Sequence, residues 1–394
     1  MTGLEIRAVH PHELESAASL IADVFAADHH KHHHALYALH TTAMPDRPGF
    51  DLADTRVAFL NGMPVALARV EKRALRYGSV RLKVAGIGDV CTHPEYRHQG
   101  YSEIVVRDAL AYATEIGAHL VLLRDPGDYY QRYGFSSVLP DYALHYHADD
   151  ILTIPPPQVY RLRPALMDDL AELDYLYEQH WSGRVAFSRS PALWRWRLQH
   201  NHIGRVMLVC NEQGDAEGYL WRHNFNRQQL EMIASTPEAM LRLMQLVAMQ
   251  TPHQDIYLPI PPDDAIVAFS RLFLPVTLSA SFHPESGWMA RPVNIRRLLP
   301  ALLPEIKDHL QNIAYLTDNI TPLLDVRPEG IVIGLHNKPE MQCQLTQRDF
   351  IQVMFGTLRP AMLAQRTSIA REHVRMLEML FPPRMAVLAA WDWF

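Results

Sequence analysis

The segment that most constrains this chain runs from Asp89 to Ser102 and reads Asp-Val-Cys-Thr-His-Pro-Glu-Tyr-Arg-His-Gln-Gly-Tyr-Ser. A predicted strand leads into a loop with an Arg-x-x-Gly pattern, and a predicted helix follows at once. Such a turn directs unpaired backbone N–H groups and the positive end of a helix toward one point, where a phosphate or pyrophosphate can bind. Gly100 lets the backbone approach that ligand without a Cβ, and Arg97 and His98 can add positive charge.

The elements around this segment alternate between strand and helix. The predicted helix extends from about Gly100 to Ile116, with apolar residues three and four apart on one face. We expect strands at 4–7, 56–60, 64–72, 84–92, 119–124, 160–163 and 330–335, and helices at 14–25, 170–181, 295–303, 350–354 and 369–380. The chain is therefore predicted to be a mixed α and β protein.

Two stretches divide the chain, and its first two parts begin alike. Pro155–Pro156–Pro157 stiffens one connection, and turn-forming residues gather at 283–287. Superposing Arg7 on Arg163 places Leu14 on Leu170, each after a short strand and before a helical pattern. This weak repeat predicts two copies of one αβ unit.

Composition excludes several classes of protein. The 394 residues suggest two or three domains, and the net charge of −6 argues against nonspecific nucleic-acid binding. Three distant cysteines form neither a disulfide framework nor a CxxC metal motif. Neither a secretory leader nor an apolar run of membrane-spanning length is present, so we expect a cytoplasmic protein that does not bind membranes.

A second motif, Tyr130-Gln-Arg-Tyr-Gly-Phe135, follows the Arg97–Ser102 loop by about thirty residues. Together, in this order, the two motifs resemble those of the GNAT acetyltransferases. In that family the loop cradles the pyrophosphate of coenzyme A, the preceding strand pairs with its pantetheine arm, and a tyrosine sits beside the thioester sulfur. Ser102 stands where the family has Gly or Ala, and its small side chain is expected to fit.

The resemblance extends over the whole chain, to the Eis-type acetyltransferases. It implies an α/β (α+β) chain of tandem GNAT-like folds, the second degenerate, followed by a domain similar to sterol carrier proteins. The expected boundaries are 1–154 for the catalytic GNAT domain, 158–284 for its degenerate copy and 285–394 for the third domain, which begins Gly287-Trp-Met-Ala-Arg. The resemblance also implies a homo-oligomer, with a hexamer as one form.

The same resemblance assigns roles to residues. Tyr130 would be the general acid, and the α-carboxylate of Phe394, at the chain end, the base. Tyr129 and Tyr133 are neighbours that could be mistaken for Tyr130, and Asp392 is an alternative carboxylate. The residues implied to contact acetyl-CoA are Val90, Cys91, Thr92, Arg97, His98, Gln99, Gly100, Tyr101, Ser102, Glu103, Asp125 and Pro126.

Three other features have ordinary explanations. The tract His29-His-Lys-His-His-His34 looks like a metal motif but lacks Cys or carboxylate ligands, so we expect a solvated loop and no metal. Trp194-Arg-Trp-Arg197 could suggest a nucleic-acid surface, but packing between domains suits an acidic chain better. The second repeat has no Arg-x-x-Gly loop near 234–241 and is not expected to bind coenzyme A.

The expected function is acetyl transfer from acetyl-CoA to a primary amine by direct attack. The phenol of a tyrosine can supply the proton that the leaving thiolate takes, whereas a carboxylate needs burial or a water relay to act as a base. The acceptor, whether an aminoglycoside, a polyamine or a lysine-containing peptide, cannot be chosen from the sequence. Two alternatives stay open: a non-catalytic carrier of an apolar ligand in the third domain, and a transferase for longer acyl-CoA.

Overall fold

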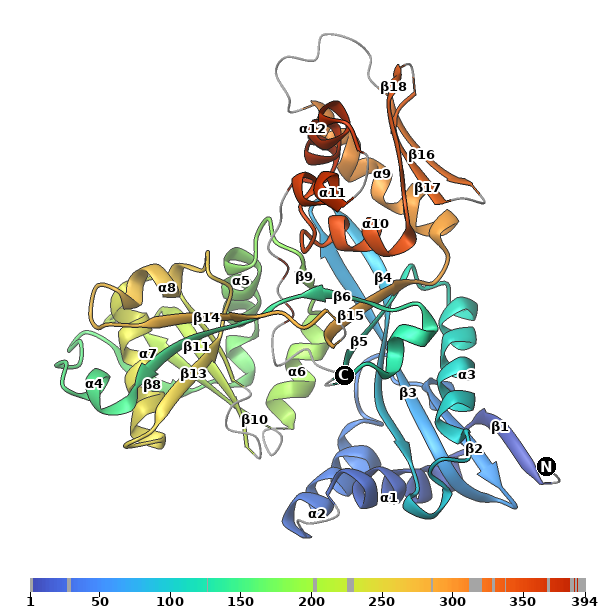
Figure 1. The fold of residues 1–394 in the computed structure, drawn as a ribbon. Helices are drawn as coiled ribbons and strands as arrows, with labels where there is room; N and C mark the ends of the chain where they lie inside the picture. Colours follow the sequence, from blue (N-terminus) through green and yellow to red (C-terminus); the bar gives the residue numbers. More distant parts are fainter. Residues whose placement is uncertain are drawn as a thin grey trace.

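The computed structural model describes residues 3–26, 30–125, 127–200, 204–224, 230–284, 286–311, 321–327, 330–336, 338–366, 369–382, 386 and 388. Figure 1 shows three lobes: the blue N-terminal part at the lower right, the green and yellow middle part at the left, and the orange and red C-terminal part at the top. The protein is a mixed α/β protein, as the sequence predicts. No helix in these ranges is both long and apolar enough to span a membrane.

The N-terminal lobe is built on one large sheet with the strand order β1-β2-β3-β4-β5-β15-β6, and β9 pairs with β3. Only β4 and β5 run parallel. The strands are β1 (Leu4–Ala8), β2 (Thr55–Leu60), β3 (Met63–Tyr77), β4 (Val80–Thr92), β5 (Leu120–Asp125), β6 (Ser136–Leu139), β9 (Ala186–Phe187) and β15 (Gly287–Pro292).

The β3–β4 hairpin is longer than the predicted strands at 64–72 and 84–92. Beyond Arg69, charged residues break the apolar pattern of β3. The sequence pattern therefore did not predict that the strand continues to Tyr77. In the structure its far end is buried against the C-terminal lobe, where the Tyr77 hydroxyl donates to the carbonyl of Met354 at 2.9 Å. The hairpin therefore extends because another part of the chain covers it, a contact that local sequence cannot reveal.

Helices cover both faces of this sheet. α1 (Leu14–Phe25) packs Leu20 and Ile21 against Phe59 and Leu67 on one face. α3 (Tyr101–Glu115) packs its buried residues Val105, Ala109 and Ala113 against the other. The predicted helix and its apolar face are confirmed.

The histidine tract does not form the loop we expected. Where the structure describes it, the tract belongs to α2 (His30–Ala38), and His33 Nε2 lies 2.7 Å from Asp23 Oδ1 on α1. Histidine is only a moderate helix former, so packing of α2 on α1 decides the conformation. Asp28 and His29 lie outside the described residues.

The middle lobe contains a four-stranded sheet, β12-β11-β10-β8, and a three-stranded sheet, β13-β7-β14. The strands are β7 (Asp141–His147), β8 (Arg161–Pro164), β10 (Gly204–Cys210), β11 (Ala216–His223), β12 (Leu230–Ala234), β13 (Asp255–Pro259) and β14 (Thr277–Ser281). The helices are α4 (Ala148–Leu152), α5 (Leu170–His180), α6 (Pro191–Gln199), α7 (Pro237–Gln250) and α8 (Ala265–Ser270).

The predicted repeat has a matching local structure. Arg7, at the end of β1, donates to both carboxylate oxygens of Glu13 at 2.7 and 2.8 Å. Arg163, in β8, donates to both carboxylate oxygens of Asp169 at 2.6 and 2.7 Å, across the same six-residue spacing. Each pair ties a strand to the helix that follows, α1 or α5, as two copies of one unit would.

The C-terminal lobe packs helices on the sheet β16-β17-β18. Its elements are α9 (Ile295–Gln311), β16 (Pro322–Arg327), β17 (Gly330–Leu335), β18 (Lys338–Leu345), α10 (Gln347–Met354), α11 (Pro360–Arg366) and α12 (Arg371–Leu380). The sheets do not follow the boundaries expected near residues 154 and 284. β15 lies in the N-terminal sheet, and β7 pairs with β13 and β14 of the middle lobe.

Candidate active site

A fork between β4 and β5 forms the centre of the candidate site. The two strands pair only where Val84–Gly86 faces Leu120–Leu122. β15 pairs with the opposite edge of β5 along its whole length, from Leu120 to Asp125, and beyond Gly86 β4 pairs only with β3 among the described strands. The edge of β4 from Ile87 to Thr92 is therefore open toward β5, and its backbone can pair with an extended ligand.

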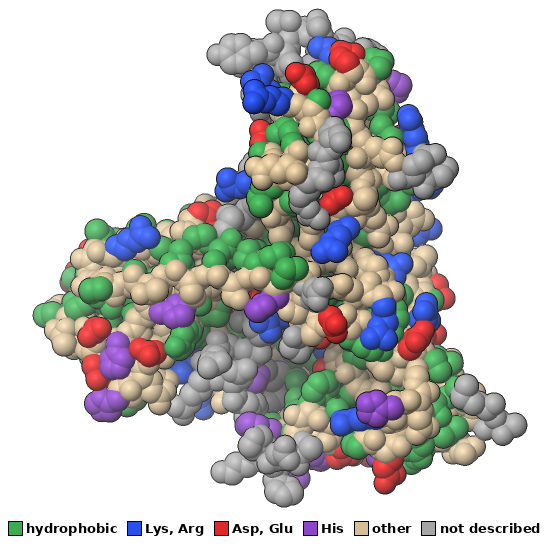
Figure 2. All heavy atoms as spheres, in the orientation of Figure 1, with side chains coloured by type: hydrophobic (Ala, Val, Ile, Leu, Met, Phe, Trp, Pro, Cys, Tyr) green, Lys and Arg blue, Asp and Glu red, His purple; other side chains and the backbone are tan. Residues whose placement is uncertain are grey.

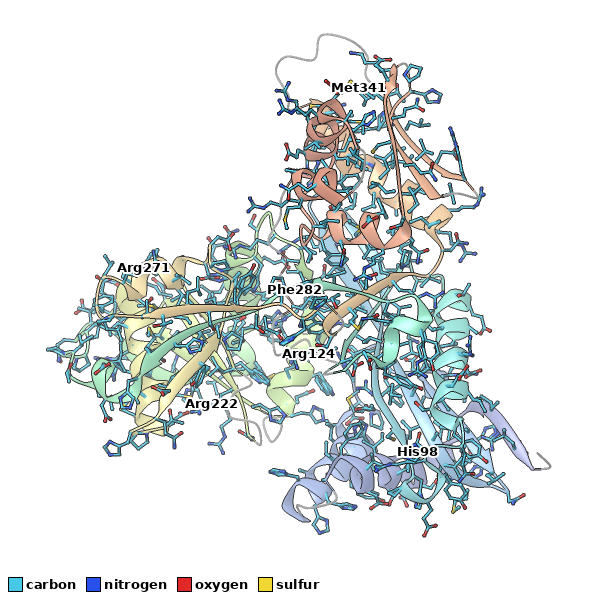
Figure 3. All side chains as sticks on the ribbon, viewed as in Figure 1. His98, Arg124, Arg222, Arg271, Phe282 and Met341 are labelled. Atoms are coloured by element: carbon cyan, nitrogen blue, oxygen red, sulfur yellow. The ribbon has the colours of Figure 1, made fainter. Side chains whose placement is uncertain are left out.

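The loop after β4 forms a turn with left-handed backbone at the mouth of the fork. His98 has φ 61° and Gly100 has φ 86°, and Gly100 is the N-cap of α3 without any side-chain cap. A Cβ at Gly100 would meet nothing within 4 Å. Within the described residues no side chain caps the first N–H groups of α3, which leaves them available to a ligand, as phosphate binding requires. Figure 3 labels His98 on this loop.

In the predicted degenerate copy, the helix α7 begins differently from α3. α7 begins after Thr236, whose hydroxyl accepts from the backbone N–H of Ala239 at 3.2 Å. Tyr160 and Glu217 bond to the same hydroxyl. Side chains of the protein thus occupy this helix N-terminus, whereas the N-terminus of α3 is left to a ligand.

The predicted contact residues present different groups to the fork. Arg97, His98 and Gln99 are exposed. Cys91 is buried against α1, where burial raises the pKa of its thiol, and Tyr101 is buried in the core under α3. Only the backbone of these two is left for a ligand. The Glu103 carboxylate accepts from Arg107 at 2.9 Å, one turn along α3.

Three neighbouring tyrosines on the short helical turn η5 (Tyr129–Tyr133) have distinct hydrogen bonds. The Tyr129 hydroxyl donates to Ser102 Oγ at 2.8 Å, and the Tyr133 hydroxyl donates to Tyr129 at 3.0 Å. Within the described part of the chain, the Tyr130 hydroxyl has no hydrogen-bond partner, although its side chain is only 9% exposed. Tyr130 is therefore the tyrosine whose hydroxyl is available to a ligand.

Asp125 links the end of β5 to this turn. Its carboxylate accepts from the backbone N–H groups of Gly127 and Tyr129, and burial raises its pKa. Its Oδ2 atom is buried without a partner in the regions the structure describes. Burial, together with the nearby Asp125 charge, raises the pKa of Tyr130 above that of a free phenol. Pro126 and Phe394, both predicted site residues, lie outside the described residues.

On the other side of β4, charged residues missed by the sequence analysis surround the fork. Asp89 has a left-handed φ of 52° directly before Val90, and its Oδ2 accepts from Arg69 Nε at 2.5 Å. His40 Nε2, in the π-helical turn η2 (Leu39–Ala43), lies 3.7 Å from the same carboxylate. Burial lowers the pKa of His40, an effect that Asp89 opposes and Arg69 reinforces.

Arg69 also lines a cavity of about 660 Å³ between the N-terminal and middle lobes. The ladder of β3 with β2 ends at Arg69 and that with β9 begins at Leu75, so the cavity lies along the open edge of β3 between them. Its lining residues are Met44, Arg47, Pro48, Gly49, Phe50, Asp54, Arg69, Val70, Glu71, Lys72, Arg73, Ala74, Arg81, Asp174, Glu178, Ser188, Arg189, Ser190, Pro191 and Leu193. The cavity is separated from the fork by the width of β3 and β4, and Arg69–Asp89 bridges the two.

Glu71 organises the buried side of this cavity. Its carboxylate is paired with the guanidinium groups of Arg47, Arg69 and Arg73. Burial would raise the pKa of Glu71, but the three guanidinium groups hold it below its ordinary value. The sequence carried a signal for this cluster, since Arg69, Glu71 and Arg73 alternate along a strand and must share one face.

Helix α6 closes the cavity; Trp196 packs between the lobes as expected, whereas Trp194 lies in the core of the middle lobe. Trp196 Nε1 donates to the carbonyl of Ala43 at 2.7 Å, and its ring packs with Met44 and Leu193. The Arg47 guanidinium lies 5.4 Å from the centre of the same ring. The middle lobe is thus attached directly over the β3 side of the N-terminal sheet.

Comparison with known proteins identifies the N-terminal domain. Residues 5–138 match the family described as acetyltransferase (GNAT) domain. No curated protein matches the chain. The fold is similar to a GCN5-related N-acetyltransferase from Kribbella flavida, at 16% identity over 99% of this chain and 98% of that chain, with a TM-score of 0.68.

Two further solved structures share the whole fold. One is a probable N-acyltransferase from Enterococcus faecalis, at 14% identity over 100% of both chains, with a TM-score of 0.69. The other is Eis1 from Mycobacterium abscessus, at 15% identity over 97% of this chain and 99% of that chain, with a TM-score of 0.61. Residues 5–138 therefore match an acetyltransferase (GNAT) domain, and the three solved structures share the fold of the whole chain.

Proposed function

We propose that the protein transfers an acetyl group from acetyl-CoA to a primary amine by direct attack at the fork between β4 and β5. The observation that carries this proposal is the meeting of three features: the uncapped N-terminus of α3 at Gly100, the open edge of β4, and the available hydroxyl of Tyr130. They suit, in turn, the pyrophosphate, the pantetheine arm and the thioester sulfur of acetyl-CoA.

The proposed reaction balances with these groups. The amine nitrogen attacks the thioester carbonyl carbon, and backbone N–H groups of Val90–Thr92 stabilise the oxyanion. The carbon–sulfur bond then breaks, and the thiolate takes the Tyr130 proton. A phenol is protonated at neutral pH, and burial, which raises the pKa of Tyr130, keeps it in that form.

The base in this proposal is the α-carboxylate of Phe394, which takes the proton that the amine nitrogen loses after its attack. Ala386 pairs in parallel with Val185, directly before β9, and Leu388 is buried in the core. Ser188–Pro191, which follow β9, line the cavity. Phe394 itself lies outside the described residues.

We also propose the Eis-type arrangement for the whole chain: a catalytic domain, a degenerate copy and a sterol-carrier-like domain, assigned from the sequence to 1–154, 158–284 and 285–394, with β7 in the second unit and β15 in the first. The full-length fold similarity to Eis1 and the matched Arg7–Glu13 and Arg163–Asp169 units support it. A cytoplasmic homo-oligomer acting on an amine small molecule or a lysine-containing peptide completes the proposal.

An acceptor screen tests the function. The protein is incubated with acetyl-CoA and a panel of aminoglycosides, polyamines and lysine peptides, and release of free coenzyme A is measured. We expect release with at least one amine and the acetylated amine in the products. Release with palmitoyl-CoA but not acetyl-CoA would instead support the longer-chain transferase, and binding without any transfer would support a carrier.

A further inference from the structure

His40 is a buried histidine beside the proposed reaction site. Figure 2 shows histidine side chains on the surface of all three lobes, whereas only 5% of His40 is exposed. It belongs to η2, which packs on α1, on the face of the sheet opposite α3. The proposed pyrophosphate site lies at the N-terminus of α3, so His40 approaches the fork from the face that coenzyme A leaves free.

Asp89 brings a carboxylate from β4 to this histidine. It directly precedes Val90, whose backbone N–H is proposed to stabilise the oxyanion. Arg69 Nε donates to Asp89 Oδ2 at 2.5 Å and holds the carboxylate, whereas Oδ1 has no hydrogen-bond partner in the described ranges. Because 18% of the Asp89 side chain is exposed, a ligand at the fork can contact the free oxygen.

The gap between the two side chains fits one amino group. His40 Nε2 lies 3.7 Å from Asp89 Oδ2, which is too long for a hydrogen bond. Neither ring nitrogen of His40 has a hydrogen-bond partner within the part of the chain that the structure describes. A nitrogen about 2.9 Å from each of these two atoms spans the gap, so one amino group can donate to both side chains.

The charges around this pair favour a neutral amine. Among the described residues, the charged groups that face His40 are Asp89 and Arg69. Burial lowers the pKa of His40, Asp89 opposes this effect and Arg69 reinforces it, so the ring is neutral at pH 7 and can accept a proton. An ammonium group that binds here therefore meets a carboxylate and a neutral base, and the Arg69 guanidinium favours loss of its proton.

We propose that Asp89 binds the ammonium group of the acceptor and that His40 removes one of its protons, which leaves the neutral amine that attacks acetyl-CoA. This inference deepens the proposed function and rests on it. One N–H bond breaks, its electron pair stays on the nitrogen, and the proton binds the His40 ring, which later releases it to solvent. The proton that the nitrogen loses after the attack replaces the one that Tyr130 gives to the thiolate. Each turnover of an ammonium acceptor thus releases one proton.

The pH dependence of the unmodified protein tests this step. With an alkylamine from the acceptor screen, kcat/KM should be nearly constant between pH 7 and pH 9, because His40 is neutral there and converts the bound ammonium. A protein that used only free amine would gain about tenfold in kcat/KM per pH unit, since an alkylamine such as lysine titrates near pH 10.4. Such a rise in the unmodified protein would overturn the inference.

Two variants assign the roles. His40→Gln should lower kcat/KM by about 100-fold at pH 7 and approach the parent protein at pH 9, where solvent supplies more of the free amine. Asp89→Asn tolerates the left-handed φ of 52° and should raise KM about 10-fold while changing kcat less, because the ammonium loses its carboxylate. His336→Gln, at an exposed position, is the control and should behave like the parent.

The pH at which activity is lost separates a base from a structural residue. An equal loss at pH 7 and pH 9 in His40→Gln would show that His40 only supports the fold, and this outcome would contradict its role. Calorimetry should give both variants the acetyl-CoA affinity of the parent. Absence of transfer to every amine by the unmodified protein rejects the proposed function, whereas transfer with a rising pH profile rejects this inference alone.

Discussion

At the scale of single residues, the tyrosines of η5 show how a motif acquires distinct roles. Tyr129 and Tyr133 form a chain of hydroxyls that ends on Ser102, the position where the GNAT motif has Gly or Ala. The serine thus fits the loop and also ties it to η5. Tyr130 packs its ring against Phe135 and keeps its hydroxyl available.

Replacing Tyr130 tests its role as the acid. Tyr130→Phe should lower kcat by roughly 10²–10⁴ and leave acetyl-CoA affinity nearly unchanged, because it removes a proton donor and little packing. Since the pKa of Tyr130 is raised, the acid should lose its proton only above the ordinary tyrosine value of about 10. Ionisation of Tyr130 should therefore cause no decrease of kcat at pH values below the ordinary tyrosine pKa.

The matched control is Tyr129→Phe, which removes the bond to Ser102. We expect it to weaken acetyl-CoA binding more than it lowers kcat. If Tyr129→Phe lost kcat and Tyr130→Phe did not, the assignment would be off by one residue.

Gly100 is the second residue whose role can be measured. Gly100→Asp places a negative charge where the pyrophosphate is expected, so acetyl-CoA affinity should fall at least about 10-fold, or about 1.4 kcal/mol, by calorimetry. Gly100→Asn has nearly the same size and also tolerates a positive φ, so it separates charge from backbone strain. If Gly100→Asp bound acetyl-CoA as tightly as the parent protein, the loop would not be part of the binding site.

At the scale of elements, the β3–β4 hairpin joins the acyl site to the cavity. Glu71 stands opposite Gly86, where the pairing of β4 with β5 ends. Arg69 connects Glu71 to Asp89, and Asp89 meets His40 from η2. Charged residues of β3 thus lie at the level of the fork. The histidine beside them comes from a π-helical turn, a feature that is frequent at functional sites.

The buried histidine predicts a stability that depends on pH. The pKa of His40 is lowered by burial, so its contribution is fully present above the unfolded value of about 6.5. It is lost as pH falls toward the folded pKa, because the unfolded chain then binds the proton more readily. Asp89 and Arg69 face the ring and oppose each other in this effect.

Urea unfolding at pH 8 and pH 5 measures the effect. The loss of unfolding free energy between these values should be smaller in His40→Gln than in the parent protein. His336→Gln, at an exposed position, serves as the control and should behave like the parent. An identical loss in all three proteins would show that His40 does not titrate on unfolding.

At the scale of the whole molecule, the N-terminal sheet depends on a distant strand. β15 pairs with β5 on one side and β6 on the other, and Trp288, Met289 and Ala290 are buried there. The catalytic lobe therefore needs residues that follow the whole middle lobe in sequence.

The isolated segment 1–154 should consequently not fold. Without β15, β6 loses its partner and the apolar contacts of Trp288 and Met289 disappear, at about 1.5–3 kcal/mol each. Circular dichroism and amide NMR dispersion should show a largely unfolded chain. Fusing residues 286–294 through a flexible linker should restore structure, and a folded 1–154 segment without that strand would contradict the prediction.

The chain end provides a second test at this scale. Extending the protein beyond Phe394 by two residues moves the α-carboxylate and keeps every side chain, so activity should fall severely while the thermal midpoint stays unchanged. Full activity of the extended protein would exclude the terminal base. Loss of activity in Asp392→Asn alone would transfer the role to that side chain.

The sequence by itself determined the local parts of this protein. The predicted loop at Arg97–Gly100 and the helix that follows it are present, because glycine conformation and apolar spacing act within a few residues. The domain class, acetyltransferase, follows from the same residues. The prediction of a loop for the histidine tract was wrong, because packing of α2 against α1 outweighs the weak local preference of histidine for non-helical structure.

Only the tertiary structure decided the rest. It inserts β15 into the N-terminal sheet, extends the β3–β4 hairpin under the C-terminal lobe, and brings Asp174 into one cavity with Arg81. Pairing, burial and charge compensation join residues far apart in the chain, and no local pattern records which distant partner each will meet. The loop that we propose for coenzyme A could therefore be found from sequence, whereas the charges that line the cavity between the lobes could not.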